Sequence, residues 1–178
     1  MTFNPKSFLR RFRREEDGHM VVEFALAIPL MFGLFMTSVE LGVYQVRQGF
    51  LDRGLDMAVR NVRLNTGANY SHSDIKQMVC EYSGFLEDCD NALKLEMMPV
   101  SARSFSGFPN AIDCADVSLP VTPSTTFVHG SEHELMMLRA CYSFNPVFPM
   151  TGLGGSFSKD GAGRVKMTAM SGFVQEPS

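Results

Sequence analysis

A carboxylate inside an apolar stretch is the first feature of this sequence that suggests chemistry. Glu23 stands five residues after Gly18, and the sixteen residues from Phe24 to Val39 carry no charge. A charged side chain in hydrocarbon is costly and requires a partner. We therefore expect Glu23 to form an ion pair in apolar surroundings.

Four cysteines offer a second kind of chemistry, and all of them follow the apolar stretch: Cys80, Cys89, Cys114 and Cys141. An even number in an exported segment indicates disulfides, with three pairings open. We favour Cys80 with Cys89, which closes a short loop at a helix end, and Cys114 with Cys141, which ties a loop to a strand. Four buried thiols are the alternative. No CxxC occurs, so neither a zinc ribbon nor a thioredoxin-like pair is indicated.

Two histidines, His129 and His133, stand four residues apart, a spacing that on a helix would face one metal ion. Gly130 interrupts them and no third ligand is evident, so a solvated loop is predicted in place of a metal site. The sequence also lacks a nucleophile elbow and a phosphate loop. We expect no metal, no cofactor and no enzymatic activity, and we interpret Arg139 and Tyr142 as structural.

The elements that position these residues begin with a helix across a membrane. The uncharged run spans roughly 24 Å, and residues 19–46 together are long enough to cross a bilayer. Pro29 should bend this helix. No small-residue cleavage site follows, so the helix should be retained. Five basic residues precede it and place the N-terminus in the cytoplasm and the following domain outside; they are Lys6, Arg10, Arg11, Arg13 and Arg14.

An amphipathic stem is predicted over residues 47–66, continuing the same helix. Apolar residues recur every three or four positions, and charged residues occupy the opposite side. The apolar stripe packs either against its own domain or against the stem of a partner. The stripe comprises Leu41, Tyr44, Gln48, Leu51, Leu55, Ala58 and Val62, and the opposite side comprises Arg47, Asp52, Arg53, Asp56, Arg60 and Arg63.

Residues 67–178 are predicted to form one small exported α+β domain, with a three- or four-stranded antiparallel sheet packed against helices. A short helix follows the capping residues Ser71 to Asp74 and ends near Gly84. Alternating apolar residues and flanking prolines predict the strands, at 93–97, 116–121, 134–144 and 164–174.

A glycine- and proline-rich loop over residues 145–163 carries five apolar side chains that need cover. One hypothesis is that they contact a neighbouring subunit or the outer leaflet of the membrane. The alternative is that they fold back onto the sheet. These residues are Val147, Phe148, Met150, Leu153 and Phe157.

The N-terminal segment resembles the TadE/TadF-like minor pilins, or pseudopilins, of the tight-adherence (Flp-type) pilus system. The resemblance rests on RRFRREEDG followed by HMVVEFALAIPLMFGLFMTSVELG, which is similar to the leader, cleavage glycine, VEFAL signature and later ELG of that family. It implies that residues 1–18 are a leader removed after Gly18 by a prepilin peptidase, which leaves His19 as the new N-terminus. It further implies that Glu23, beside Phe24, pairs with the freed amine during subunit association.

The resemblance also implies a location and partners. The protein would be a single-pass protein of the bacterial inner membrane with a periplasmic domain. It would assemble or anchor a Flp-type adhesion pilus together with other minor pilins, the major pilin and the assembly platform. Without residues 1–18 the formal charge is -5, from eleven basic and sixteen acidic residues, so no nucleic-acid partner is expected. The alternative function is a signal-anchored periplasmic sensor or solute-binding domain.

Overall fold

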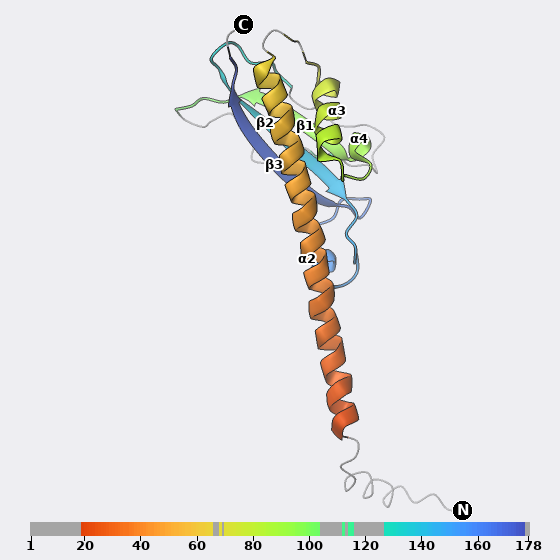
Figure 1. The fold of residues 1–178 in the computed structure, drawn as a ribbon. Helices are drawn as coiled ribbons and strands as arrows, with labels where there is room; N and C mark the ends of the chain where they lie inside the picture. Colours follow the sequence, from red (N-terminus) through yellow and green to blue (C-terminus); the bar gives the residue numbers. More distant parts are fainter. Residues whose placement is uncertain are drawn as a thin grey trace, which may run out of the picture.

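Helix α2 (His19–Leu64) carries a small domain on its C-terminal half and leaves its N-terminal half bare (Figure 1). The structure, a computed structural model, describes residues 19–65, 68, 70–103, 112, 114, 115 and 127–176. The helix has 46 residues, and at 1.5 Å per residue it is about 69 Å long. Pro29 lies inside it without ending it. The prediction of one helix that continues from the apolar segment into the stem is confirmed.

Three antiparallel strands form the sheet, in the order β1 (Leu93–Pro99), β2 (Leu135–Phe144) and β3 (Val165–Val174). Ala140 at the centre of β2 lies opposite Leu95 on one side and Ala169 on the other. Side chains alternate between the two faces of a strand, so this register places alternate apolar residues on one face. The predicted α+β arrangement with a three- or four-stranded antiparallel sheet is confirmed, and the described residues contain three of its strands. The further strand predicted over residues 116–121 lies outside the described residues.

The hydrophobic core lies between one face of the sheet and two helices, α2 and α3 (His72–Ser83). Leu51, Leu55 and Ala58 on α2 are almost completely buried there. The stem stripe therefore packs against its own domain. Gly54 allows the close crossing of α3, because an added Cβ would lie 2.0 Å from Ser83 Oγ. The sheet contributes the other large core residues, which are Leu93, Leu95, Met97, Met136, Leu138, Tyr142, Phe144, Val165, Met167 and Phe173.

Local signals define the ends of α3. Ser71 Oγ accepts the Asp74 N–H at 3.3 Å, and the Asp74 carboxylate accepts the Ser71 N–H at 2.8 Å, which forms a capping box. Gly84 ends the helix at a φ of +60°, in the left-handed region that glycine adopts without strain. A disulfide from Cys80 then connects α3 to Cys89, the first residue of the short α4 (Cys89–Ala92).

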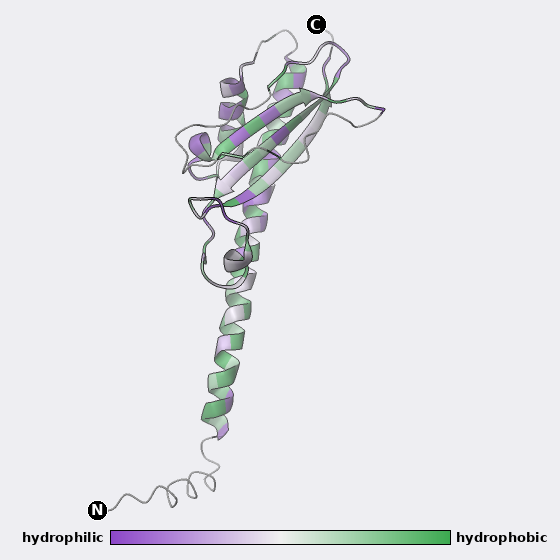
Figure 2. Cartoon of the chain, turned by 180° about the vertical axis from the view of Figure 1, so that it is seen from behind, coloured by the Kyte–Doolittle hydropathy of each residue, from purple (hydrophilic) through white to green (hydrophobic). Residues whose placement is uncertain are grey.

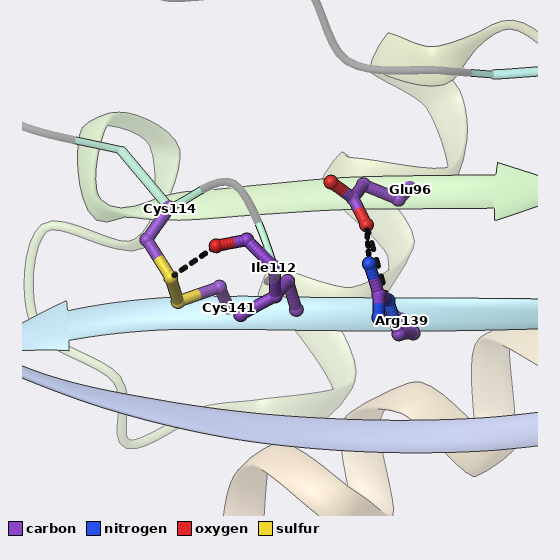
Figure 3. A network of polar contacts seen from close by, with 5 residues as sticks. All are labelled: Glu96, Ile112, Cys114, Arg139 and Cys141. Carbon is purple, nitrogen blue, oxygen red and sulfur yellow. Dashed lines mark hydrogen bonds and ion pairs between the residues drawn. A yellow bond between two sulfur atoms is a disulfide. The ribbon is translucent and has the colours of Figure 1, made fainter. Parts of the chain in front are cut away.

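The second face of the sheet holds an ion pair and the other disulfide (Figure 3). Glu96 of β1 and Arg139 of β2 are cross-strand neighbours and form a salt bridge, although each is only 6% exposed. Cys141, also on this face of β2, is bonded to Cys114. Both disulfides follow the connectivity favoured from the sequence, and Arg139 has the structural position predicted for it.

Candidate functional site: the apolar helix and the collar loop

The N-terminal half of α2 is coloured mostly hydrophobic along its length (Figure 2). Ten large apolar side chains there are each more than half exposed: Met20, Val21, Val22, Phe24, Leu26, Leu30, Met31, Phe32, Leu34 and Phe35. Within the described residues, α2 is the one helix long and apolar enough to cross a membrane. A soluble surface rarely exposes an apolar patch of this extent, so the segment needs an apolar surrounding.

Glu23 lies on this apolar surface, one helical turn after His19. The Nδ1 atom of His19 is 3.9 Å from Glu23 Oε2, and the two side chains are 84% and 69% exposed. A shallow hollow beside Glu23 is lined by Met20, Phe24 and Ala27. The predicted processing residue Gly18 lies outside the described residues. The geometry leaves the Glu23 carboxylate available to a cation at the start of the same helix or on a neighbouring chain.

A second carboxylate of α2, Glu40, is in the opposite situation, because it is only 1% exposed. Its Oε1 accepts the Val147 N–H at 3.1 Å and its Oε2 accepts the Phe148 N–H at 2.8 Å. Charge-assisted bonds of this kind are among the stronger hydrogen bonds in proteins. Glu40 thus connects the end of the uncharged run to the loop that follows β2.

The buried stripe of α2 therefore begins differently from the predicted stripe. Leu41 was expected to start it, but Leu41 is 47% exposed and Glu40 is buried in its place. Glu40 and Leu51 are eleven residues apart, which is close to three turns of 3.6 residues, so they share one face. Arg47 also differs from the prediction. It was placed on the outward side, but its guanidinium lies 4.9 Å from the centre of the Phe144 ring and donates to Asn145 O at 2.9 Å.

Residues 145–157, which we call the collar loop, pack along this part of α2. Tyr44 stacks on Phe157 with ring centres 5.6 Å apart. Gly152 opens the short helix α5 (Gly152–Ser156) directly against α2, where an added Cβ would lie 2.7 Å from Thr37 Cγ2. The φ of Gly152 is +56°, so both the conformation and the close approach require glycine. The loop is held to the helix over three turns.

The five apolar residues predicted as a contact surface divide into two groups. Phe148, Leu153 and Phe157 are half-buried, whereas Val147 is 44% exposed and Met150 is 91% exposed. The loop as a whole lies against α2, at the end of the sheet nearest the apolar segment (Figure 1). Two apolar side chains of the loop therefore point outward beside the helix.

The two histidines considered as metal ligands have separate environments. His129 Nε2 lies 2.7 Å from Tyr70 O, and the His129 ring makes an edge contact with Phe127. His133 occupies a turn at a φ of +63°, and its N–H donates to Gln175 O at 3.0 Å. Across the described ranges, no three potential metal-ligating side chains come together.

Comparisons with protein-family models, with curated proteins and with solved structures return no match to this chain. What the structure itself shows is a long apolar N-terminal helix joined to a small antiparallel-sheet domain with two disulfides. This combination is consistent with a pilin-like fold. The disulfides indicate that the domain lies outside the cytoplasm.

Sequence reasoning missed Glu40, which directly follows the uncharged run, as a positioning residue. A signal was present, because an acidic residue directly after sixteen uncharged residues lies next to apolar surroundings and needs a polar partner there. Its partners are backbone amides 107 and 108 residues away. Every residue except proline carries a backbone N–H, so the residue types do not show which amides will bind Glu40.

Proposed function

We propose that this protein is a TadE/TadF-like minor pilin that is anchored in the bacterial inner membrane and acts in the assembly or anchoring of a Flp-type pilus. The observation that carries the proposal is the continuity of α2. One half of this helix presents mostly apolar side chains, with Glu23 among them, and the other half is the central element of a disulfide-bonded domain. A chain of this design carries a folded domain at a fixed distance from a membrane or a helical bundle.

Glu23 supports a role in subunit association. A carboxylate on a lipid-facing surface is unfavourable unless a cation neutralises it. Cleavage after Gly18 would create an amine at His19, one turn from this carboxylate. The pairing with that amine, on the same chain or on a neighbour, would then favour lateral association of the helices.

The stem also offers a surface to related subunits. Although its stripe is buried in the domain, the other side of α2 leaves Val46, Met57 and Leu64 between 39% and 61% exposed. These apolar residues alternate with Arg53 and Arg60 along the helix. Neighbouring minor pilins and the major pilin are the partners we propose for this side.

A deletion experiment tests the assembly role. Removing the gene should abolish surface pili and adherence, and the wild-type gene should restore both. Glu23→Ala should insert into the membrane normally but fail to restore pili, whereas Glu81→Ala, which removes an exposed carboxylate of α3, should restore them. Normal pili in the deletant would contradict the proposal and favour an anchored sensor or solute-binding domain.

A separate experiment tests processing. Membranes that contain an active prepilin peptidase should yield a chain that begins at His19, as measured by mass spectrometry of the N-terminal peptide. Gly18→Leu should leave the chain uncut. A wild-type chain that keeps residue 1 in such membranes would remove the prepilin part of the proposal.

A further inference from the structure

The position of the collar loop along α2 indicates whether the loop lies at the level of water or of lipid. The twenty residues from Met20 to Val39 span about 30 Å, the thickness of the hydrocarbon core of a bilayer. Thr37 is two residues before the end of that span, so it lies about 3 Å inside the hydrocarbon boundary. Because Gly152 packs directly against Thr37, the tip of the collar loop lies at the level of the outer leaflet. This step rests on the proposed insertion of α2.

The composition of the collar loop fits a lipid surrounding. Its thirteen residues, NPVFPMTGLGGSF, include no charged side chain. Met150 at its tip is 91% exposed, and Val147 is 44% exposed. An apolar side chain as exposed as Met150 gains free energy when it enters an apolar phase. Leu34 and Phe35, three and two residues before Thr37 on α2, are 63% and 64% exposed.

The backbone of the collar loop is also suited to an apolar phase, where each unsatisfied polar group is costly. Pro146 and Pro149 have no N–H to satisfy. The amides of Val147 and Phe148 donate to Glu40. Three further amides donate within the loop, from Thr151 to Phe148 O, from Gly155 to Thr151 O and from Phe157 to Leu153 O. Lys159, just after the loop, donates its ammonium to Pro149 O and places a positive charge at the rim, where anionic headgroups lie.

We propose that the collar loop is a membrane-docking element, which inserts Met150 into the leaflet on the side of the domain and fixes the depth of α2 with Glu40 at the boundary. The partner is the lipid bilayer and not a second protein. In this arrangement Glu40 holds the loop to the helix, and the loop stops the helix from sliding further into the membrane.

Tryptophan fluorescence tests this proposal without ambiguity, because the chain contains no tryptophan. We would reconstitute the full chain in vesicles of phosphatidylethanolamine and phosphatidylglycerol, with or without lipids brominated near the top of the acyl chains. Met150→Trp should emit at shorter wavelength than in water and lose most of its intensity to brominated lipid. Met170→Trp is the matched control, since Met170 is an exposed methionine of β3, 65% exposed and outside the collar loop. It should be unquenched.

A third variant, Phe32→Trp, reports on the helix itself and should be quenched by lipids brominated deeper in the chain. If Phe32→Trp is quenched and Met150→Trp is not, α2 spans the membrane and the docking proposal alone is overturned. If neither variant is quenched, α2 does not insert into the bilayer, and the proposed membrane anchoring is overturned together with the docking proposal. A blue shift of Met150→Trp without quenching would mean a protein contact, and equal quenching of Met170→Trp would place the whole sheet on the bilayer. Both results would overturn the docking proposal.

Discussion

The carboxylate of Glu40 and the backbone amide of Phe148 lie 2.8 Å apart, although 108 positions of sequence separate them. This bond joins the point where α2 leaves its apolar segment to the loop that follows β2. It makes the domain and the apolar helix one unit at the level where a membrane surface would lie. Further along α2 the core residues Leu51, Leu55 and Ala58 hold the same domain to the helix.

Replacing Glu40 tests that connection. Glu40→Ala should leave two part-buried amides without this acceptor and lower the free energy of unfolding by about 1–3 kcal/mol, whereas Glu40→Gln keeps one acceptor and should lose less. Hydrogen exchange of a peptide covering residues 145–150 is the sharper measurement, because Pro146 and Pro149 have no amide. Exchange at Val147 and Phe148 should accelerate in Glu40→Ala and not in Glu23→Ala. Unchanged exchange would show that the loop is held without this carboxylate.

The crossing of α2 and α3 depends on the absence of a side chain at Gly54. Gly54→Ala should destabilise the domain by about 1–3 kcal/mol, because the added Cβ collides with Ser83 Oγ and lies 2.7 Å from Val79 O. Gly49→Ala is the control, since nothing lies within 4 Å of a Cβ there. That substitution should stabilise the helix by about 0.5–1 kcal/mol through its better helix propensity. Denaturant unfolding in detergent measures both, and equal effects would contradict the packing argument.

The buried pair of Glu96 and Arg139 should show strong coupling. Arg139→Met leaves a carboxylate buried without its guanidinium partner and should cost about 3–5 kcal/mol of folding free energy. The double variant Glu96→Leu with Arg139→Met should recover most of this loss, because an apolar pair fits the same buried site. A double-mutant cycle by denaturant unfolding gives the coupling directly. Additive losses would mean that the two charges act independently.

Acid sensitivity should come partly from His72. Burial, together with the positive charges of Lys76 and Lys94, holds the pKa of His72 below its ordinary value of 6.5. As the pH falls, the unfolded chain is therefore protonated at His72 before the folded chain is. The stability that neutral His72 contributes is fully present above pH 6.5 and is lost as the pH falls through the lower, folded-state pKa.

His72→Phe, which keeps the edge contact of the ring with Phe127, should flatten this dependence. The measurement is the free energy of unfolding from neutral to mildly acidic pH, in wild type and variant. As the pH falls, wild type should lose more stability than the variant, so the difference between the two curves should change, and parallel curves would exclude His72 as the source.

Sequence periodicity was sufficient for the two longer helices and the three strands, but not for the short helices α4 and α5. The uncharged run and the spacing of three and four residues defined α2, and the alternation of apolar residues defined β1, β2 and β3. Cap and turn residues such as Ser71, Asp74 and Gly84 defined the ends of α3, because their conformational preferences act within a few residues. Loop lengths favoured one disulfide connectivity without excluding the others, since four cysteines allow three pairings.

The tertiary structure decided which face of α2 is buried just after the apolar segment. The amphipathic pattern around residues 40–47 is ambiguous, because a glutamate occupies the buried position and Leu41 an exposed one. Only the arrival of the Val147 and Phe148 amides makes burial of that carboxylate favourable. Hydrogen bonds to backbone groups depend on where the chain passes in space and not on which residues it contains. The sequence by itself therefore determined the helix, the strands and the lone Glu23 of the apolar surface, while the fold alone placed the collar loop on Glu40.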